Sequence, residues 1–528
     1  MWIEIVTDQR GARRWHLRLR ERLLGLEGVR RVAFRQADCA ASWPASISHL
    51  LTLERILSRQ HGRVNLLEVA LRAELPEELA LAPEVPELVI DLSGAAPATP
   101  EKVRQRTLRP VYEGEHGELA AVAALLAGSA PVIGLENEDG VLVAAGLPSL
   151  EAAIGLTGGL EATVSRVAAL IEGAVVSPRQ KLNPKLAPSP QQPLRSPAAF
   201  FMRNLAHNAL RAIYHLCCHS PHWRVGWRFN DGPGVMETGA LGGGRWEILP
   251  DQSSGFSADP FPIGWRGRNC IFYEWFDYTA NKGVIYGQSF DTHGPVGKPF
   301  LALEEPWHLS YPFLIEEGGE LYMMPEASIS GAVTLYRCVE FPRKWERVSQ
   351  LLTGIEAADA TIFRHDGRFW MTSVIRDGVG GYSDTLAIHH AQNLFGPWEP
   401  HALRPVMIDA RYARPAGAVV ERAGALWRPV QQCSAGYGKG LALARIDTLD
   451  PENFSQSTMR MISPGRYWPG NRLHTLNRSG RLECIDGAIL TPKPLLLRKL
   501  MHDVVDRARR GGAVDPEAND WNPSTQVV

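Results

Sequence analysis

Apolar strands separated by glycine turns alternate along the second half of the chain. The clearest unit has an apolar strand over 311–315, a Gly-Gly turn, and a second apolar strand over 320–324 that leads into Glu326. Two such runs on either side of a glycine turn predict a β-hairpin. The same outline recurs before and after this hairpin, which indicates a repeat unit.

Five segments share the outline, and they begin at Ala258, Ser310, Ala358, Ala413 and Arg472. Each turns at a glycine, and these are Gly267, Gly319, Gly367, Gly424 and Gly480. The period of roughly fifty residues lies in the range of propeller blades. Twelve of the fifteen tryptophans also lie from Trp223 onward, as in an aromatic-rich all-β region. The repeats predict a five-bladed β-propeller, because the competing β-sandwich shows no such self-similarity.

The propeller prediction places residues that are distant in sequence at one site. The innermost strand of every blade lines one central channel, so equivalent positions of the first strands converge. Those positions hold Asp259, Tyr311, Asp359, Arg414 and His474. The second strands add another level, where Glu326 of LYMMPE and Gln431 of LWRPVQ match. We therefore expect a cluster of charged and polar groups at one mouth of the channel.

Residues 1–176 show strands that alternate with helices. Strands are expected over 2–6, 29–34 and 87–92, and helices over 13–26, 46–59 and 160–171. This order predicts an α/β domain with a mainly parallel sheet. Ser93 and Gly94, which follow a strand, form either the mouth of a ligand cleft or an ordinary strand–loop junction. No GxGxxG or Walker motif accompanies them.

The two patterns are joined by a proline-rich stretch. Six prolines in 177–197 predict a semi-extended linker. A connecting helix over 198–220 follows, with apolar residues at helical spacing: Phe200, Phe201, Leu205, Ala209 and Ile213. We expect it to pack on the next domain. A membrane-surface helix is the less favoured alternative, since the segment has only two arginines and no lysine. The propeller is expected over 221–492, and a charged helix with a disordered tail over 493–528.

Composition narrows the function classes. The formal net charge of −1 and the pI near 7.0 imply no bulk attraction to nucleic acid or anionic membranes. Seven cysteines without CxxC spacing argue against a disulfide scaffold or a zinc site, and we expect no metal or other cofactor. The N-terminus lacks a signal-peptide core, and no apolar run of ~18 residues occurs. We expect a cytoplasmic protein without stable membrane insertion.

Several motifs of the second half occur in a characteristic order. They are HLSYPF with GGELYMMPE, DATIFRHDGRFW, GPWEPH, ARPAGAVV, RPVQQCSAGYG, and LHTLN followed by IDG. With them, residues 221–487 resemble the N-terminal domain of plant glucosamine inositolphosphorylceramide transferase and its bacterial relatives. That family is related to five-bladed propellers of the glycoside hydrolase family 43 type. The plant transferase chemistry is attributed to a separate domain, which nothing here resembles, so the resemblance does not imply transferase activity.

The relation to family 43 hydrolases implies roles for several residues. Those enzymes use a base Asp from the first blade, a second Asp that tunes and orients, and an acid Glu. Asp259 matches the first Asp and Asp359 the second. The acid is expected from the fourth blade, where this chain has Arg414 and Gln431, so Glu326 is the nearest substitute. The predicted catalytic set is Asp259, Glu326 and Asp359. The predicted substrate-binding set is His308, Tyr311, Arg414, Arg428, Gln431, Gln432 and His474. One departure is visible, since relatives tend to have Gln-Asp-Cys where this chain has Gln431-Gln432-Cys433.

Residues 1–176 resemble the N-terminal domain of formyltransferases that is attached to some bacterial polysaccharide proteins. The catalytic Asn, His-Pro-Ser-Leu and Asp of that family are not recognisable, and His116 is the nearest imidazole. The resemblance implies a degenerate formyltransferase-like domain, more scaffold than catalyst.

Two function hypotheses follow. The first is a carbohydrate-active enzyme of surface polysaccharide or exopolysaccharide metabolism that cleaves or transfers at a glycosidic bond with channel carboxylates. The second is a non-catalytic glycan-binding or accessory module for polysaccharide biosynthesis. Both imply an oligosaccharide or glycoconjugate as ligand, polysaccharide-assembly enzymes as partners, and no nucleic acid. A formyl or acyl transferase is disfavoured by the missing motif.

Purely structural roles compete with these assignments. A first-strand Asp can cap a blade turn by accepting backbone N–H bonds, and Arg414 can serve as the ion-pair partner of such an Asp. Glu326 can be a solvent-facing loop residue, and His474 can be a hydrogen-bonded core histidine.

Overall fold

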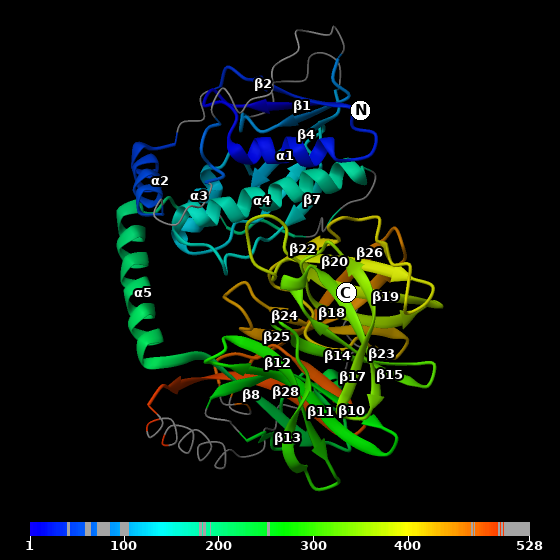
Figure 1. The fold of residues 1–528 in the computed structure, drawn as a ribbon. Coiled ribbons are helices and arrows are strands. Elements are labelled where there is room, and N and C mark those ends of the chain that lie inside the picture. Colours follow the sequence, from blue (N-terminus) through cyan, green and yellow to red (C-terminus); the bar gives the residue numbers. More distant parts are fainter. Residues whose placement is uncertain are drawn as a thin grey trace. The chain divides into compact units, whose positions relative to one another are not determined.

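The computed structural model divides the chain into two compact units, each described separately below (Figure 1). The structure describes residues 1–39, 43–58, 65–70, 85–95, 105–178, 182, 186–190, 192–250, 254–465, 468, 470–494, 497 and 500. Most of the expected C-terminal helix and tail, 493–528, therefore lies outside the described residues. No helix among the described residues is long and apolar enough to span a bilayer.

The N-terminal unit is built on a mixed sheet with the strand order β2-β1-β3-β4-β6-β7. The strands are β1 (Trp2–Thr7), β2 (Arg31–Gln36), β3 (Leu88–Asp91), β4 (Thr107–Tyr112), β6 (Ile133–Glu136) and β7 (Leu142–Gly146), and the short β5 (Glu115–His116) pairs with β4. The strands from β2 to β4 are parallel, whereas β6 and β7 are antiparallel to their neighbours. The α/β class is confirmed, and the sheet is mixed rather than mainly parallel.

Four helices complete the core of this unit: α1 (Arg14–Leu24), α2 (Ala45–Ser58), α3 (Leu119–Ala127) and α4 (Gly155–Val176). Helix α4 is buried along most of its length, and its apolar residues pack with those of β1, β3, β6 and α1. A helix that is apolar around most of its circumference must lie inside the fold. This explains why α4 shows no simple one-faced pattern in the sequence.

Two segments from the later part of the chain belong to the N-terminal unit. They are Arg376–Thr385 and Ala402–Ala410, and the second contains β22 (Met407–Ile408). The buried guanidinium of Arg166 on α4 donates from Nε to both carboxylate oxygens of Asp384 at 2.9 Å. Asp384 also accepts the N–H of Ser149 at 2.7 Å. These bonds fix the first segment, and the Leu147 N–H bond to the Ile408 carbonyl fixes the second.

The connecting helix α5 (Pro197–Cys217) packs on the N-terminal unit at its start. Phe200 is buried in the core of that unit, with Phe201 partly buried beside it. The expectation that this helix packs on the following domain is therefore wrong for its first turns. Beyond them most side chains of α5 are exposed, including its larger apolar ones.

The second unit is a five-bladed β-propeller, as the repeats predict. The first four blades are β10–β13 (Gly255–Trp265, Arg268–Asp277, Lys282–Phe290, Pro295–Leu303), β14–β17 (Ser310–Glu317, Glu320–Glu326, Ala332–Glu340, Lys344–Thr353), β18–β21 (Ala357–His365, Arg368–Ile375, Thr385–Ala391, Glu399–Pro400) and β23–β26 (Val420–Arg422, Ala425–Gln432, Gly440–Leu449, Phe454–Ile462). Each blade is an antiparallel meander whose first hairpin is one of the sequence repeats.

The fifth blade joins the two ends of the propeller sequence. Strands β27 (Leu476–Ser479) and β28 (Leu482–Pro492) pair with β8 (Cys218–Phe229) and β9 (Glu247–Ile248), and the short helix α6 (Val235–Thr238) lies between β8 and β9. The long β28–β8 ladder joins the C-terminal strands of the propeller to its N-terminal strands within one blade, and this pairing closes the ring. A ring closed in this way leaves only the short outer edges of the blades.

The first strands of the first three blades carry the same backbone irregularity. Their ladders shift register after Ala258, Ser310 and Ala358. The next residues, Asp259, Tyr311 and Asp359, have φ values of 51°, 42° and 53°. A bulge re-aims the side chain that it carries, and positive φ in a non-glycine residue stores strain that often marks a functional position. The repeated bulge thus explains how equivalent residues are directed toward one channel.

The buried Arg166–Asp384 pair generates the first prediction. Replacing Asp384 by Asn leaves a buried guanidinium without its counter-charge, which costs about 3–5 kcal/mol when one partner of a buried pair is removed. Denaturant unfolding followed by the helical circular dichroism signal measures this loss, because α1 to α4 lie in the N-terminal unit.

The matched control is Glu4→Gln, which removes the acidic partner of Arg35 in a more exposed pair of the same unit, with an Nε–Oε2 distance of 2.9 Å. The control should lose no more than about 1 kcal/mol. Equal stability of the Asp384→Asn variant and the parent would contradict the assignment of 376–385 to this unit.

Candidate functional site

The propeller contains a cavity of about 570 Å³ at the mouth of its channel. Four of its lining residues come from the predicted convergence level or from the end of a second strand, namely Asp259, Glu326, Arg414 and His474. The remaining lining residues are His215, Cys218, His219, Pro221, Trp223, Phe256, Glu274, Phe276, Tyr278, His308, Ser310, Tyr437 and Lys493. The convergence expected from the repeats is therefore seen for residues of four blades.

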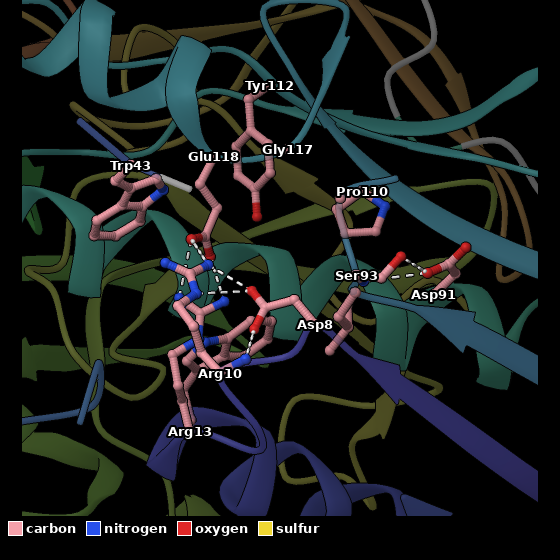
Figure 2. Close-up of a pocket in the computed structure, with 13 residues that line it drawn as sticks. Asp8, Arg10, Arg13, Trp43, Asp91, Ser93, Pro110, Tyr112, Gly117 and Glu118 are labelled. Carbon is pink, nitrogen blue, oxygen red and sulfur yellow. Dashed lines mark hydrogen bonds and ion pairs between the residues drawn. The ribbon is translucent and has the colours of Figure 1, made fainter. Parts of the chain in front are cut away.

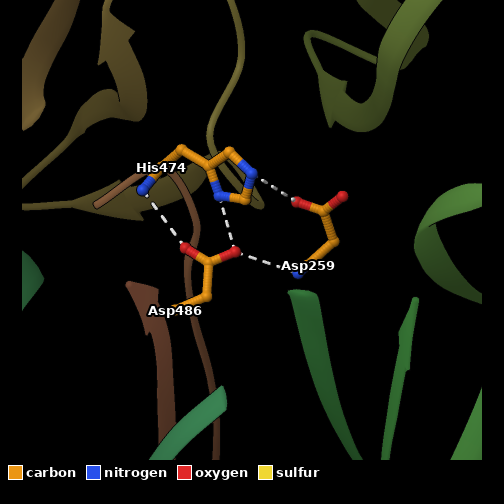
Figure 3. A group of neighbouring side chains, drawn as sticks. All are labelled: Asp259, His474 and Asp486. Carbon is orange, nitrogen blue, oxygen red and sulfur yellow. Dashed lines mark hydrogen bonds and ion pairs between the residues drawn. The ribbon is translucent and has the colours of Figure 1, made fainter. Parts of the chain in front are cut away.

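A buried carboxylate, Asp486 on β28, organises one side of the cavity (Figure 3). One of its oxygens accepts the backbone N–H groups of His474 at 3.1 Å and Thr475 at 2.9 Å. Its other oxygen accepts the N–H of Asp259 at 2.9 Å and lies 2.6 Å from His474 Nδ1. Asp486 thus ties the first strand of blade one to the chain that leads into blade five.

His474 lies between two carboxylates. Its Nδ1 faces Asp486, and its Nε2 lies 3.8 Å from Asp259 Oδ1 (Figure 3). Thr475 donates its hydroxyl to the same Asp259 oxygen at 2.7 Å. The imidazole stacks on Trp223 with ring centroids 3.8 Å apart. Burial alone would lower the pKa of His474, but Asp486 and Asp259 outweigh burial and raise it.

Asp259, His474 and Asp486 are also the residues that could hold a metal ion. One ligand atom of each lies within 4.8 Å of the others. The 2.6 Å separation of His474 Nδ1 and Asp486 is that of a charge-assisted hydrogen bond. A metal held by both atoms would have to displace this shared proton. The cluster as it stands is hydrogen-bonded rather than arranged around a cation.

A second cluster surrounds Asp359 and Arg414. Arg414 Nε donates to Asp359 Oδ2 at 2.6 Å, and Gln431 donates to the same oxygen at 2.9 Å. The guanidinium also reaches toward Glu326, with an NH2–Oε2 distance of 3.9 Å, and lies over the ring of Tyr437 at 4.7 Å. Arg414 is thus held by a carboxylate behind it and an aromatic ring beside it, and it lines the cavity.

Glu274 is a cavity carboxyl that the repeat comparison did not single out. It pairs with Ala258 across β10 and β11, just as Glu326 pairs with Ser310 across β14 and β15. The register that predicted Glu326 could therefore have found Glu274 too. His308 lies beside it, with an Nε2–Oε1 distance of 3.4 Å. The Gly283 N–H donates to His308 Nδ1, so a neutral His308 carries its proton on Nε2, toward Glu274.

Crowding and burial change the protonation of these carboxyls. Burial raises the pKa of Asp259 to about 6, although His474 opposes the shift. Burial likewise raises the pKa of Asp359 to about 7; Arg414 opposes this shift and Glu326 adds to it. Burial and the negative charges of Asp259 and Glu326 raise the pKa of Glu274 well above its usual range. Like charges that share a dry site cannot all ionise together, so the cavity holds a proton donor near neutral pH.

Aromatic rings form much of the remaining wall. Phe256 stacks on Phe276 with centroids 4.9 Å apart, and His219 stacks on Tyr278 at 3.8 Å. With Trp223 and Tyr437 they place flat apolar faces next to carboxyl and guanidinium groups. Such a wall can bind a ligand that has both apolar faces and many hydroxyl groups.

The predicted site residues fall into three groups. Asp259, Glu326, His308, Arg414 and His474 line the cavity. Asp359 and Gln431 are buried and hold Arg414 or one another. The others bond away from the cavity: Tyr311 to Thr361, Arg428 to Gln456 and the Ala413 carbonyl, and Gln432 to Ser434. Asp486 and the aromatic wall were not among the predicted residues, although the IDG motif contains Asp486.

The junction after β3 in the N-terminal unit borders a second, much smaller cavity (Figure 2). Its volume is about 30 Å³, so it has room for water but not for an organic ligand. The surrounding charges pair with one another, as in the 2.7 Å contact between Arg13 NH2 and Glu118 Oε1. Gly94 has φ +72°, and a Cβ there would lie 3.0 Å from the Cα of Gly117. The Ser-Gly pair thus serves a close backbone contact, which favours the ordinary-junction interpretation.

Comparison with known proteins relates the propeller to one family. The profile of the family described as "Glucosamine inositolphosphorylceramide transferase 1, N-terminal" matches residues 249–484. The protein of that name from Arabidopsis thaliana is 32% identical over 262 residues, which are 47% of this chain and 34% of the plant protein. Its namesake from Oryza sativa subsp. indica is 30% identical over 234 residues, 42% of this chain and 31% of the rice protein. The chain therefore spans about a third of the curated relatives it matches.

Solved structures include similar folds at low identity. The catalytic domain of Coprinopsis cinerea GH62 alpha-L-arabinofuranosidase is 13% identical and covers 49% of this chain and 85% of its own, with a TM-score of 0.36. At this TM-score the likeness has no weight for the site.

The raised pKa of Glu274 generates the second prediction. The pKa of a Glu side chain in the unfolded chain is about 4.3. The pKa of Glu274 in the folded protein is higher, so folded Glu274 keeps its proton to higher pH. The folded state then binds more protons, so this group's contribution to stability falls as pH rises from the unfolded toward the folded pKa. Glu274→Gln removes the titration. Its stability relative to the parent should therefore increase from about pH 5 to about pH 8 in denaturant unfolding.

The control is Glu421→Gln, which changes an exposed carboxyl of the propeller. Its stability relative to the parent should change little with pH. A Glu274→Gln difference that stays constant or shrinks with rising pH would show that Glu274 is not held protonated.

Proposed function

We propose that the propeller channel is a glycan site that performs acid–base chemistry at a glycosidic bond. The single observation that supports this most strongly is the group of carboxyls around one cavity, with Glu274 and Asp259 shifted toward the protonated form. Glycosidic bond cleavage uses one protonated and one ionised carboxyl on either side of the bond. The aromatic wall and the hydroxyl-binding groups fit a sugar ring.

The proposed reaction assigns one role to each carboxyl. Glu274 or Glu326 gives its proton to the leaving glycosidic oxygen as the bond from that oxygen to the anomeric carbon breaks. Asp259, ionised above about pH 6, accepts the proton of the attacking water or acceptor hydroxyl, whose oxygen forms the new bond. Asp359 is a positioning residue in this scheme, because it reaches the cavity through Arg414. Arg414, His308 and His474 would orient sugar hydroxyls.

The substrate class is a further part of the proposal. The curated plant relatives are named for a sugar, glucosamine, and a lipid, inositolphosphorylceramide. This naming supports a glycoconjugate of surface polysaccharide, exopolysaccharide or glycolipid metabolism as the ligand. We propose a cytoplasmic location and polysaccharide-assembly enzymes as partners.

A specific observation favours the alternative of a non-catalytic glycan-binding or accessory module. Asp359 is already paired with Arg414 and accepts a further hydrogen bond from Gln431. A site in which one carboxyl is committed to an arginine in this way can still bind sugars. The N-terminal unit is proposed as a degenerate, formyltransferase-like scaffold. The cavity at the junction after β3 supports the scaffold role, because its volume of about 30 Å³ is too small for an organic ligand.

The third prediction concerns turnover. Three substitutions keep the side-chain shape: Glu326→Gln, Glu274→Gln and Asp359→Asn. The first two remove a titratable carboxyl of the cavity, and the third removes the carboxylate that holds Arg414. Each should lower turnover of a cleaved glycoside by a factor on the order of 10² or more, as for lost general acid–base help. A panel of chromogenic glycosides and a lipid-linked oligosaccharide provide the assay, and circular dichroism checks folding.

Glu316→Gln is the matched control, since this exposed carboxyl lies on β14 outside the cavity. It should keep parental turnover. Full activity of all three site variants would overturn the acid–base assignment. If the parent turns over no glycoside but the same variants weaken glycan binding in calorimetry, the binding-module alternative takes its place.

A further inference from the structure

Helix α5 presents an apolar stripe to solvent. After Phe200, its larger apolar residues are 53% to 75% exposed, and they are Met202, Leu205, Leu210, Ile213 and Leu216. Their spacing places them on one side of a 3.6-residue helix, together with Ala206 and Ala209. A helix in a folded protein normally turns such a stripe toward a core. Here the stripe is a surface of the kind that contacts another apolar phase.

The first half of the stripe continues into an apolar groove of the N-terminal unit. This groove has a volume of about 420 Å³, and Phe201 and Leu205 of α5 line it with Leu57 and Ile154. Leu57 and Ile154 are 55% and 71% exposed. The carboxylate of Glu54 also borders the groove, but it accepts the N–H groups of Leu156 and Thr157 at 3.0 and 2.8 Å at the start of α4. The carboxylate of Glu161 borders the groove too, and it accepts the N–H of Leu66 at 2.7 Å. Because both carboxylates are bonded to backbone N–H groups, the groove extends the apolar surface of the stripe.

The charged side chains on α5 itself are arginines and histidines. No Asp or Glu occurs between Glu172 and Asp231. Helix α5 carries Arg211, His207 and His215 on the side away from the stripe. Arg203 lies at the edge of the stripe and donates to the Leu126 carbonyl of the N-terminal unit at 3.2 Å. The net charge of the whole chain, −1, does not reveal that the segment between Glu172 and Asp231 carries only basic charges. A second copy of the helix laid against the stripe would find no acidic partner for these arginines on α5, so the charge pattern disfavours self-association there.

We propose that α5 and the adjoining groove form a membrane-surface element that lies in the headgroup region of an anionic lipid bilayer. Interfacial helices combine an apolar face, buried among the acyl chains near the headgroups, with a basic polar face that attracts anionic lipid. The sequence disfavoured this alternative because two arginines are few. The exposed stripe reverses the weighting, since burial of its apolar area supplies most of such binding and Arg211 adds a preference for anionic lipid.

The C-terminal end of α5 lies at the propeller cavity, so a membrane contact of α5 also affects how a ligand reaches that cavity. His215 of α5, and Cys218 and His219 directly after it, line the propeller cavity. A helix that lies in the interface therefore brings the mouth of this cavity to the level of lipid headgroups. This step rests on the proposed function, because it assigns the glycan of a lipid-linked glycoconjugate as the ligand that enters the cavity from the membrane.

Vesicle co-sedimentation of the full chain tests the membrane contact. Vesicles of phosphatidylcholine alone and with about a third phosphatidylglycerol serve as probes at low and high salt. The parent should bind the anionic vesicles more strongly and lose that preference as salt screens the charges. Leu205→Gln, Ile213→Gln and Leu216→Gln combined should weaken binding at least about tenfold. Arg211→Gln should weaken it about fivefold on anionic vesicles only.

The matched control carries the same kind of change at three exposed apolar residues of the propeller, Val296→Gln, Leu301→Gln and Ile329→Gln. It should bind vesicles as the parent does. Failure of the parent to bind, or equal binding by the stripe variant, would overturn the proposal. A parent dimer that the stripe variant converts to a monomer in light scattering would also overturn it, because a second copy would then cover the stripe.

The same variants separate the membrane contact from the glycan chemistry. If both proposals hold, the stripe variant should act on or bind a water-soluble oligosaccharide as the parent does, but lose the lipid-linked form when it is presented in vesicles. Vesicle binding without any glycan binding would retain the membrane proposal and reject the proposed function. Glycan activity without vesicle binding would do the reverse.

Discussion

The carboxylate of Asp486 is the interaction on which the channel depends. It accepts backbone N–H groups from blade one and from the chain entering blade five, and it also pairs with His474. A buried charge is costly unless several donors surround it, and here four groups do so. The same bonds that satisfy Asp486 bring Asp259 and His474 to one wall. The hydrogen bonds of Asp486 therefore both connect blade one to blade five and position two residues of the site.

A second constraint is the balance of charge in a nearly dry channel. Five carboxyls lie in the cavity or support it, namely Asp259, Glu274, Glu326, Asp359 and Asp486. Arg414 and His474 pair with four of them, and Lys493 and His308 also line the cavity. Such an excess of acid is tolerated when some carboxyls stay protonated, which is the direction in which burial moves Asp259, Asp359 and Glu274. The protonation that relieves the repulsion is also what supplies a proton donor. As pH rises, ionisation of these carboxyls supplies the base that the proposed chemistry needs, but it also increases the repulsion that destabilises the fold.

The cavity is completed by elements that lie outside the repeats. Trp223, His219 and Tyr278 come from the strand that closes the ring and from the turn after β11. They add aromatic faces to the rim, beyond that of Phe276 in the first repeat. Helix α5 ends at the same rim, so the segment with the largest exposed apolar stripe also leads into the site. The polar cavity of the propeller is therefore bordered by the end of the amphipathic helix α5.

Much of this arrangement follows from local patterns. The alternating strands, the five glycine turns and the polar residue at each first strand were sufficient for the five-bladed fold and for Asp259, Arg414 and His474 at one cavity, because repeated units in a closed ring bring equivalent positions together. Glu326 followed from the second strand in the same way. The α/β class of the N-terminal unit followed from its order of strands and helices, since such an order is compatible with few architectures.

Other features depended on long-range contacts that no local pattern contains. The tertiary fold set Asp359 behind Arg414 rather than among the residues that line the cavity. The pairing of β28 with β8 and the inclusion of 376–385 in the N-terminal unit join residues more than 200 positions apart. The sequence by itself determined that Asp259, Glu326, Arg414 and His474 would meet in the channel and that α5 is amphipathic. Only the tertiary structure decided that Asp486 and the aromatic rings join them, which carboxyls have raised pKa values, and that the apolar side of α5 stays exposed. These features depend on what packs against each group in space.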